Sequence, residues 1–309
     1  MRHDARDLIS LTDLADEDLQ AIVLRGVDHA AGRTGGERPL TGRVVGTYFS
    51  KTSTRTRTAF TCAALRLGAQ VIAYGPGDLQ LNTGESIEDT GRVFAAMLDA
   101  VVARTAGPPA ELRAMAAHPR MAVVNAMTAD EHPTQALADL TTLQERFGGI
   151  EGLRLLYVGE GNNTAAALAL ALTRFAGTHL ELRTPPGYGV DPAVLERARI
   201  LADGHGAVVA ERHDMADLPG DLDVVYTTRW QTTGTSKPDP DWRSVFAPFR
   251  VTAELWDDHS KAVFMHDLPA HRGEEVDADV LDGPASIAFT QAENKLHSAM
   301  AVLEWCMRG

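Results

Sequence analysis

Short apolar segments alternate with helical stretches along most of the chain, and this alternation constrains the fold more than any other feature. Segments rich in Val, Leu and Ala and bounded by turn residues are typical of buried strands. They lie at 42–50, 71–74, 100–103, 122–125, 154–159, 179–183, 207–210, 223–227 and 262–266. Helical patterns include 16–30, 55–67, 132–147 and 289–307. Such alternation predicts an α/β fold with mainly parallel sheets flanked by helices.

Chain length indicates more than one domain. The sequence has 309 residues, which suits two domains of about 150 residues each. Gly148 and Gly149 break the chain after the helix predicted at 132–147. We therefore place the domain boundary there, with a first domain at 1–148.

Composition excludes several classes of protein. Lys and Arg number 29 against 42 Asp and Glu, a net charge of −13, which argues against nucleic acid or an anionic membrane as a partner. The only cysteines, Cys62 and Cys306, give neither a metal-ligand spacing nor a disulfide framework. The first residues lack the apolar core of a signal peptide, and the longest apolar run, 165–172, is too short for a membrane span. We therefore expect a cytoplasmic protein.

The segment Ser53-Thr54-Arg55-Thr56-Arg57 follows a predicted strand and begins a helix. Free backbone N–H groups and the helix dipole favour an anion at such a position, and an arginine adds a bidentate donor for phosphate. Residues 55 and 57 are about 200° apart around a helix, so both cannot face one ligand. We assign Arg55 to the ligand and Arg57 to structural pairing. A well-capped helix with surface arginines is an equally good explanation of this segment alone.

Other polar segments lie where ligand loops are expected. His132-Pro133-Thr134-Gln135 begins a helix, and either caps it or donates into a binding site. Gly159-Glu160-Gly161-Asn162-Asn163 follows a strand, but position 164 is Thr and no acidic residue ends the next strand. This broken fingerprint argues against a nicotinamide cofactor. The polar stretch 228–240 and the segment 266–269 also follow strands, where α/β proteins place ligand loops.

Together these segments resemble the aspartate/ornithine carbamoyltransferase family over nearly the whole chain, and its ornithine members most closely. The matching pieces, in the family's order, are 53–57, 85–90, Arg104, 132–135, 159–163, Asp223, 266–274 with one altered position, and 291–294. The resemblance implies a carbamoyl-phosphate domain, an amino-acid domain at 149–288, and a cleft between them. The C-terminal helix at 289–309 would pack back on the first domain.

The resemblance also implies roles for particular residues. The residues implied to bind carbamoyl phosphate are Ser53, Thr54, Arg55, Thr56, Arg104, His132, Gln135, Leu268 and Lys295. Those implied to bind the amino-acid acceptor are Asn163, Asp223, Thr227, Thr228, Arg229 and Gln231. The catalytic set is Arg55, Arg104, His132 and Asp267. No metal or other cofactor is implied. A homotrimer is implied, in which a loop near residues 80–85 reaches into a neighbouring subunit's site.

Three departures from the ornithine pattern leave the acceptor open. Asp267 replaces a Cys in His-Cys-Leu-Pro, and Lys295 replaces an Arg, which keeps the charge but loses the fork. Thr227-Thr228-Arg229 stands where ornithine enzymes carry Ser-Met-Gly, and with Gln231 it resembles the aspartate enzyme instead. Ornithine is the default acceptor, and a shorter diamino acid such as 2,3-diaminopropionate is the main rival, with aspartate third. A non-catalytic regulator that binds a phosphorylated metabolite and a nicotinamide dehydrogenase are the alternatives from other classes.

Overall fold

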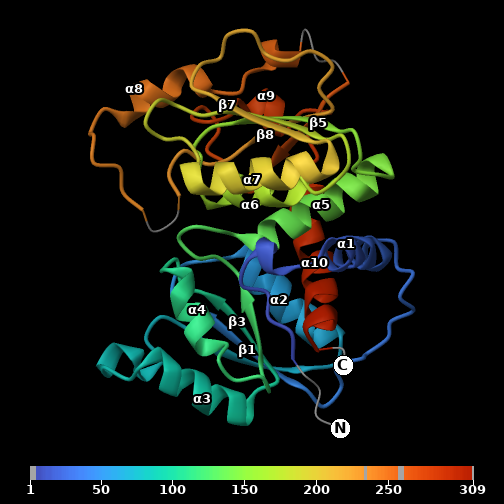
Figure 1. Ribbon diagram of the computed structural model, residues 1–309, viewed down its shortest axis with the longest axis vertical. Helices are drawn as coiled ribbons and strands as arrows, with labels where there is room; N and C mark the ends of the chain where they lie inside the picture. The colour runs from blue at the N-terminus through green and yellow to red at the C-terminus, as the bar shows by residue number, and fades with distance from the viewer. Residues whose placement is uncertain (1–4, 233–234, 257–260, 308–309) are drawn as a thin grey trace. The chain divides into compact units, whose positions relative to one another are not determined.

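The computed structural model describes residues 5–232, 235–256 and 261–307. The chain divides into two compact units (Figure 1). Unit 1 contains residues up to Glu145 and those from Glu293 onward, and unit 2 contains Arg146–Ala292. Each unit is built on its own parallel sheet, so the predicted two-domain α/β fold is confirmed.

Unit 1 has a four-stranded sheet in the order β2-β1-β3-β4. The strands are β1 (Val44–Phe49), β2 (Gln70–Tyr74), β3 (Ala100–Arg104) and β4 (Ala122–Asn125). All pairs are parallel, and the central register places Phe49 opposite Arg104. The carboxyl ends of β1 and β3 therefore lie side by side at one edge of the sheet.

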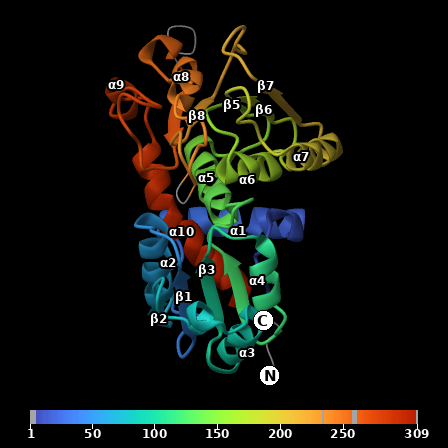
Figure 2. The ribbon, with the colours of Figure 1, turned by 90° about the vertical axis from the view of Figure 1, so that its left-hand side faces the viewer.

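Helices cover both faces of this sheet. They are α1 (Asp16–Ala30), α2 (Arg55–Arg66), α3 (Ile87–Met97), α4 (Pro109–Met115), most of α5 (Pro133–Phe147) and most of α10 (Ala288–Met307). Two short 3-10 helices lie at Leu11–Asp13 and Gln80–Thr83. Figure 2 shows α2 and α4 on opposite sides of the strands.

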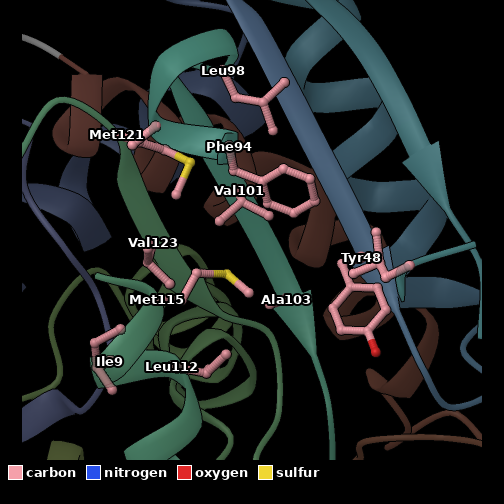
Figure 3. Packing of buried hydrophobic residues seen from close by; sticks show 12 residues of the cluster. Ile9, Tyr48, Phe94, Leu98, Val101, Ala103, Leu112, Met115, Met121 and Val123 are labelled. Atoms are coloured by element: carbon pink, nitrogen blue, oxygen red, sulfur yellow. The ribbon is translucent and has the colours of Figure 1, made fainter. Parts of the chain in front are cut away.

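One face of the sheet is apolar because it packs against α3 and α4 and forms a core with them. Phe94 and Leu98 from the α3 region and Leu112 and Met115 from the α4 region pack on alternate residues of β3, such as Val101 (Figure 3). Side chains at every second strand position point to the same face, so this spacing buries one face of the sheet. Burial of each large apolar side chain stabilises the fold by ~1.5–3 kcal/mol.

Unit 2 has a five-stranded parallel sheet in the order β7-β6-β5-β8-β9. The strands are β5 (Arg154–Val158), β6 (His179–Arg183), β7 (Val208–Arg212), β8 (Val224–Thr227) and β9 (Val263–His266). The helices are α6 (Asn163–Leu172), α7 (Pro192–His205), α8 (Trp242–Phe246) and α9 (Ala278–Leu281), with short 3-10 helices at Ala247–Phe249 and Ala253–Trp256. Helices α6 and α7 run along one face of this sheet (Figure 1).

The strand order of unit 2 creates a switch point beside β5. From β5 the chain continues to β6 and β7 on one side, and then returns to place β8 and β9 on the other. In open parallel sheets, ligands bind outside the carboxyl ends of the strands at such a point. Every helix within the described residues is too short or too polar to cross a bilayer.

Candidate functional site

The first group of predicted residues surrounds the carboxyl ends of β1 and β3 in unit 1. These strands flank the switch point of the four-stranded sheet, because the chain goes from β1 to the edge strand β2 and then to β3 on the other side. The backbone N–H and the hydroxyl of Ser50 both donate to the carbonyl oxygen of Arg104, at 3.1 and 3.2 Å. These bonds fix the loop after β1 against the end of β3.

The N-terminus of α2 is arranged for an anion. Thr54 is the N-cap residue, but its side chain makes no capping hydrogen bond within the described chain. The first turn holds Arg55 and Arg57 and no acidic residue, which opposes the usual preference of the helix dipole for negative charge. A bound anion relieves that conflict. Thr56 is buried, whereas Ser53 and Arg55 are partly exposed and Thr54 is exposed.

Arg57 has a structural role, as its helical position predicts. Its guanidinium lies over the ring of Phe49, with the central carbon 5.2 Å from the ring centroid. This is a cation–π contact with the last residue of β1 rather than an ion pair. The prediction of structural pairing named no partner, and the structure supplies Phe49.

Arg104, His132, Gln135 and Lys295 form a buried polar cluster within unit 1. Nη1 of Arg104 lies 3.5 Å from Nε2 of His132, and Nζ of Lys295 donates to Oε1 of Gln135. Nε2 of Gln135 donates to Oδ1 of Asp139 at 2.8 Å. Gln135 is only 1% exposed, and hydrogen bonds to its amide oxygen and from its amide nitrogen fix the orientation of the side chain. The structure thus brings together four residues separated by up to 191 positions in the sequence (295 − 104).

His132 is held in the neutral form. Burial, together with the positive charges of Lys295 and Arg104, lowers the pKa of His132 well below its usual range. A neutral imidazole donates one hydrogen bond without adding charge. The positive potential of this cluster therefore comes from Arg104 and Lys295, and it suits an anionic substrate.

A second group lies at the carboxyl ends of β5, β8 and β9 in unit 2. Asn162 caps α6 by accepting from the backbone N–H groups of Thr164 and Ala165, at 2.9 and 3.2 Å. The next residue, Asn163, is buried, as are Thr227 and Thr228 at the end of β8. The hydroxyl of Thr227 donates to the carbonyl oxygen of Val158 at 2.6 Å, which uses it within the sheet.

Asp267 joins this group from the end of β9. Its Oδ1 accepts from the hydroxyl of Thr228 and its Oδ2 from the hydroxyl of Thr164, both at 3.0 Å. Leu268 follows with a φ of +54°, and its N–H donates to Nδ1 of His266 at 2.8 Å. Asp267 is therefore fixed among the predicted acceptor residues of unit 2.

Asp223 is the one predicted acceptor residue that the structure places elsewhere. It directly precedes β8, and its carboxylate accepts from the backbone N–H of Arg154 at 2.8 Å. Because the strands are parallel, this contact lies at the amino end of the sheet, opposite the ends that carry Thr228 and Asp267. The assignment of Asp223 to the acceptor is wrong on this geometry, and the residue ties the starts of two strands together.

Arg229 and Gln231 lie on the segment after β8. Arg229 is half-buried, and its Nε has no hydrogen-bond partner among the described residues. Nε2 of Gln231 donates to the carbonyl oxygen of Thr235 at 2.9 Å. Gln231 is thus used within its own loop, whereas Arg229 offers donors.

Sequence reasoning missed Glu160 and Lys237. Lys237 forms an ion pair with Glu160, and the hydroxyl of Thr232 donates to the other oxygen of Glu160 at 3.0 Å. Both residues lie in segments that the sequence marks as following strands, but nothing local indicates that they pair, because they are 77 positions apart. Gly161 was recognisable as a glycine position but not for its reason: a Cβ there would lie 2.1 Å from the backbone nitrogen of Val190.

One group of possible metal ligands occurs among the described residues. Ligand atoms of His271, Glu274 and Glu275 lie within 4.8 Å of one another. Glu275 is buried and accepts from the backbone N–H of His271 and lies 3.3 Å from Nε2 of His266. These bonds give Glu275 a structural role in the turn after β9.

Comparison with known proteins finds matches to both halves of the chain. Residues 6–145 match the family model for the carbamoyl-P binding domain of aspartate/ornithine carbamoyltransferase, and residues 151–306 match its Asp/Orn binding domain. The ornithine carbamoyltransferase of Symbiobacterium thermophilum is 41% identical over 305 residues, covering 98% of both chains. That of Acidothermus cellulolyticus is 42% identical over 303 residues, covering 95% of this chain and 96% of its own.

A solved structure is similar over the same extent. Ornithine carbamoyltransferase from Pyrococcus furiosus has a TM-score of 0.93 and 37% identity, covering 100% of this chain and 99% of its own. The chain belongs to the aspartate/ornithine carbamoyltransferase family. The resemblance inferred from the motifs is confirmed, and so is the expectation of a carbamoyltransferase.

Proposed function

We propose that this protein transfers the carbamoyl group of carbamoyl phosphate to the amine of a small amino acid, with ornithine as the default acceptor. The observation that carries the proposal is the buried cluster of Arg104, His132, Gln135 and Lys295 in unit 1. It combines two cationic groups with a neutral imidazole and an oriented amide, a set of donors suited to a phosphorylated carbonyl compound.

The phosphate would bind at the N-terminus of α2. Ser53, Thr54 and Thr56 offer hydroxyl and backbone N–H donors, and Arg55 offers a charge-assisted fork. The absence of a side-chain cap on this helix, within the described residues, supports the assignment. Orphan N–H groups at a helix start need partners, and phosphate oxygens provide them.

The carbamoyl group would be held by Arg104, His132 and Gln135. A neutral amine attacks the carbonyl carbon, a C–N bond forms, and negative charge develops on the carbonyl oxygen. Donors from Arg104 and His132 would stabilise that charge. The C–O bond to phosphate then breaks, and the amine proton leaves with the phosphate, giving a ureido product and hydrogen phosphate.

Lys295 acts in this proposal mainly through Gln135. Its ammonium donates to the Gln135 amide oxygen, so the Gln135 side chain keeps one orientation. Its charge also contributes to the low pKa of His132. Leu268, which the resemblance links to carbamoyl phosphate, belongs to unit 2, and its contribution would come from the backbone after Asp267.

The acceptor would bind at the carboxyl ends of β5, β8 and β9. Asn163, Thr228 and Asp267 supply polar groups there, and Arg229 supplies a cation. A second candidate acceptor is a diamino acid shorter than ornithine. Asp267 and Arg229 favour this shorter acceptor, since ornithine enzymes carry smaller, neutral residues at both positions.

A homotrimer in the cytoplasm completes the proposal. The segment from Leu79 to Glu85 contains the short 3-10 helix Gln80–Thr83, which is held by internal hydrogen bonds such as that from the Thr83 hydroxyl to the Gln80 carbonyl oxygen at 2.9 Å. Its residues from Asn82 to Glu85 are exposed, which suits a loop that completes a neighbouring subunit's site. The free thiols of Cys62 and Cys306 fit a reducing compartment.

The test is a panel of amines assayed with carbamoyl phosphate. Ureido product and phosphate should form in equal amounts with at least one of ornithine, 2,4-diaminobutyrate and 2,3-diaminopropionate. Phosphate release without ureido product, or no turnover with any amine, would contradict carbamoyl transfer. Mixing Arg55→Ala chains with chains altered at residues 82–84 should restore partial activity if sites are shared, and an active monomer in sedimentation would contradict sharing.

A further inference from the structure

The carboxylate of Asp267 is held rigidly at the edge of unit 2 where ligands are expected. Each of its oxygens accepts a hydrogen bond from a threonine hydroxyl, Thr228 on one side and Thr164 on the other, at 3.0 Å. The side chain remains 15% exposed. A carboxylate oxygen accepts more than one hydrogen bond, so each oxygen keeps capacity for another donor.

Neither hydroxyl neutralises the carboxylate, and no described cation is paired with it. The nearest ring nitrogen, Nδ1 of His266, lies 3.5 Å away. That nitrogen already accepts the N–H of Leu268, so it presents a lone pair rather than a proton. The His266 proton is therefore on Nε2, which faces Glu275 at 3.3 Å.

Glu160 at the same edge shows the contrast. Its carboxylate is neutralised by Lys237, so it carries no charge that a ligand must balance. Asp267 is partly buried, and a partly buried charge is stable when an opposite charge accompanies it. The amine groups of an amino acid are the cations that the proposed function brings to this edge.

We propose that Asp267 binds the α-ammonium group of the acceptor and so directs carbamoyl transfer to its side-chain amine. This inference rests on the proposed function. A carboxylate beside an amine stabilises the protonated form, and a protonated amine has no lone pair with which to attack. The other amine, outside the reach of Asp267, loses its proton more readily and becomes the nucleophile.

Arg229 supports this orientation of the acceptor. It follows Thr228 directly, so its Cα lies about 3.8 Å from that of the residue that holds Asp267. The Nε of Arg229 has no partner among the described residues, and its guanidinium is suited to a carboxylate. An α-amino acid offers an ammonium and a carboxylate on one carbon. Asp267 directly follows β9 and Arg229 lies two residues after β8, and these paired strands place Thr227 opposite His266.

The regiochemistry of the product tests the inference. 2,3-Diaminopropionate has two amines, and NMR distinguishes its 2-ureido from its 3-ureido derivative. The wild-type protein should give the 3-ureido product. Asp267→Asn should raise the KM for the acceptor on the order of 10- to 100-fold, since a charge-assisted hydrogen bond is lost. The KM for carbamoyl phosphate should stay unchanged, and the share of 2-ureido product should rise.

Matched variants separate recognition from general damage. Asp203→Asn removes an exposed carboxylate of α7 and should leave both KM values unchanged. If Asp267→Asn fails to fold by circular dichroism, Thr164→Val and Thr228→Val each remove one hydroxyl that orients the carboxylate. Each should raise the acceptor KM by a smaller factor.

The inference and the proposed function fail in different ways. A 2-ureido product from the wild-type protein, or an Asp267→Asn variant with an unchanged acceptor KM, would overturn the role of Asp267 while carbamoyl transfer stands. If no amine gives a ureido product, calorimetric titration with 2,3-diaminopropionate in the presence of phosphate still tests whether Asp267 recognises the acceptor. Weaker binding by Asp267→Asn than by wild type would uphold recognition, and equal binding would overturn it.

Discussion

Lys237 is ion-paired with Glu160 although the two residues are 77 positions apart. The Lys237 ammonium also lies over the rings of Tyr188, Phe246 and Trp242, at 4.6, 4.7 and 5.3 Å from their centroids. Its side chain is only 3% exposed. The segment after β8, which carries Arg229, is thereby attached to the turn between β5 and α6.

Replacing Lys237 should loosen that attachment. Lys237→Met keeps most of the apolar packing but leaves the Glu160 carboxylate without its cation, and an unpaired, largely buried charge is costly. We expect the melting temperature to fall by several degrees and the acceptor KM to rise about 10-fold, which corresponds to ~1.4 kcal/mol. Steady-state kinetics with each substrate varied, and calorimetry, measure both effects.

Lys261→Met is the matched control for Lys237→Met, because Lys261 is an exposed lysine of the same unit. It should change neither quantity. In a double-mutant cycle, Glu160→Gln should lose most of its effect in the Lys237→Met background. Additive effects of the two variants would show that the pair does not act as a unit.

Two arginines of the first turn of α2 should behave differently. Arg55→Ala removes a predicted phosphate donor, and loss of one preorganised donor costs on the order of 100- to 1,000-fold in rate. Arg57→Ala removes the contact with Phe49, and should lower stability by ~1 kcal/mol with little change in turnover. Kinetics and thermal melts of both variants provide the measurement. Equal loss of turnover in both would contradict the separate roles.

Lys295 should set the pH dependence of the reaction through His132. Burial and the charges of Lys295 and Arg104 hold the pKa of His132 low. Lys295→Met removes one of these charges, so this pKa rises and the acid limb of the kcat/KM profile moves to higher pH. Lys295→Arg keeps the charge and should leave the limb in place. An unmoved limb in Lys295→Met would mean that His132 does not control it.

The raised pKa of the Glu131 carboxyl group predicts that the free energy of unfolding depends on pH. Burial raises the pKa of its carboxyl to about 7 from 4.5, so the folded chain holds a proton there that the unfolded chain releases above about pH 4.5. Its contribution to stability is present below that pH and is lost as the pH rises through about 7, on the order of 3 kcal/mol in total.

Glu131→Gln tests this contribution because it resembles the protonated acid. Its amide can still accept from the backbone N–H of Leu11, which lies 2.7 Å from the native carboxylate. Denaturant unfolding between pH 4.5 and 7 should show a wild-type minus variant difference that falls as the pH rises. His132 contributes the opposite slope in both proteins, because its low folded pKa favours unfolding in acid, so it cancels in the difference. A pH-independent difference would contradict the raised pKa.

Much of the fold was predictable because its signals are local. The strands at 122–125 and 179–183 and the helix at 16–30 have the predicted ends. Each is an apolar pattern bounded by turn or capping residues, so neighbours along the chain decide its limits. The strand predicted at 207–210 extends instead from 208 to 212, since pairing with β6 carries it beyond its apolar core.

The candidate site was predictable only in part, because its contacts are distant in sequence. The resemblance supplied Arg104, His132 and Lys295, but the bond between Lys295 and Gln135 needs the fold. Asp223 was misassigned because a motif does not say which end of a parallel strand a residue occupies. Neither motif nor periodicity indicates that Asp267 is held by Thr164 and Thr228.

The length of the acceptor is the property that Asp267 and Arg229 should control. Both replace smaller, neutral residues of the ornithine enzymes, and each larger side chain takes volume from the site. Arg229→Gly combined with Asp267→Cys should therefore shift the preference toward ornithine and away from 2,3-diaminopropionate. A difference of one or two methylenes is worth only ~1–3 kcal/mol, so the shift is best measured as a ratio of kcat/KM values. Arg243→Ala is the control. Arg243 lies on the exposed face of the helix whose buried face contributes Phe246 to the core of unit 2 beside Trp230, so this variant should leave the ratio unchanged. If the wild-type protein already prefers ornithine to both shorter diamino acids, these two residues do not shorten the acceptor.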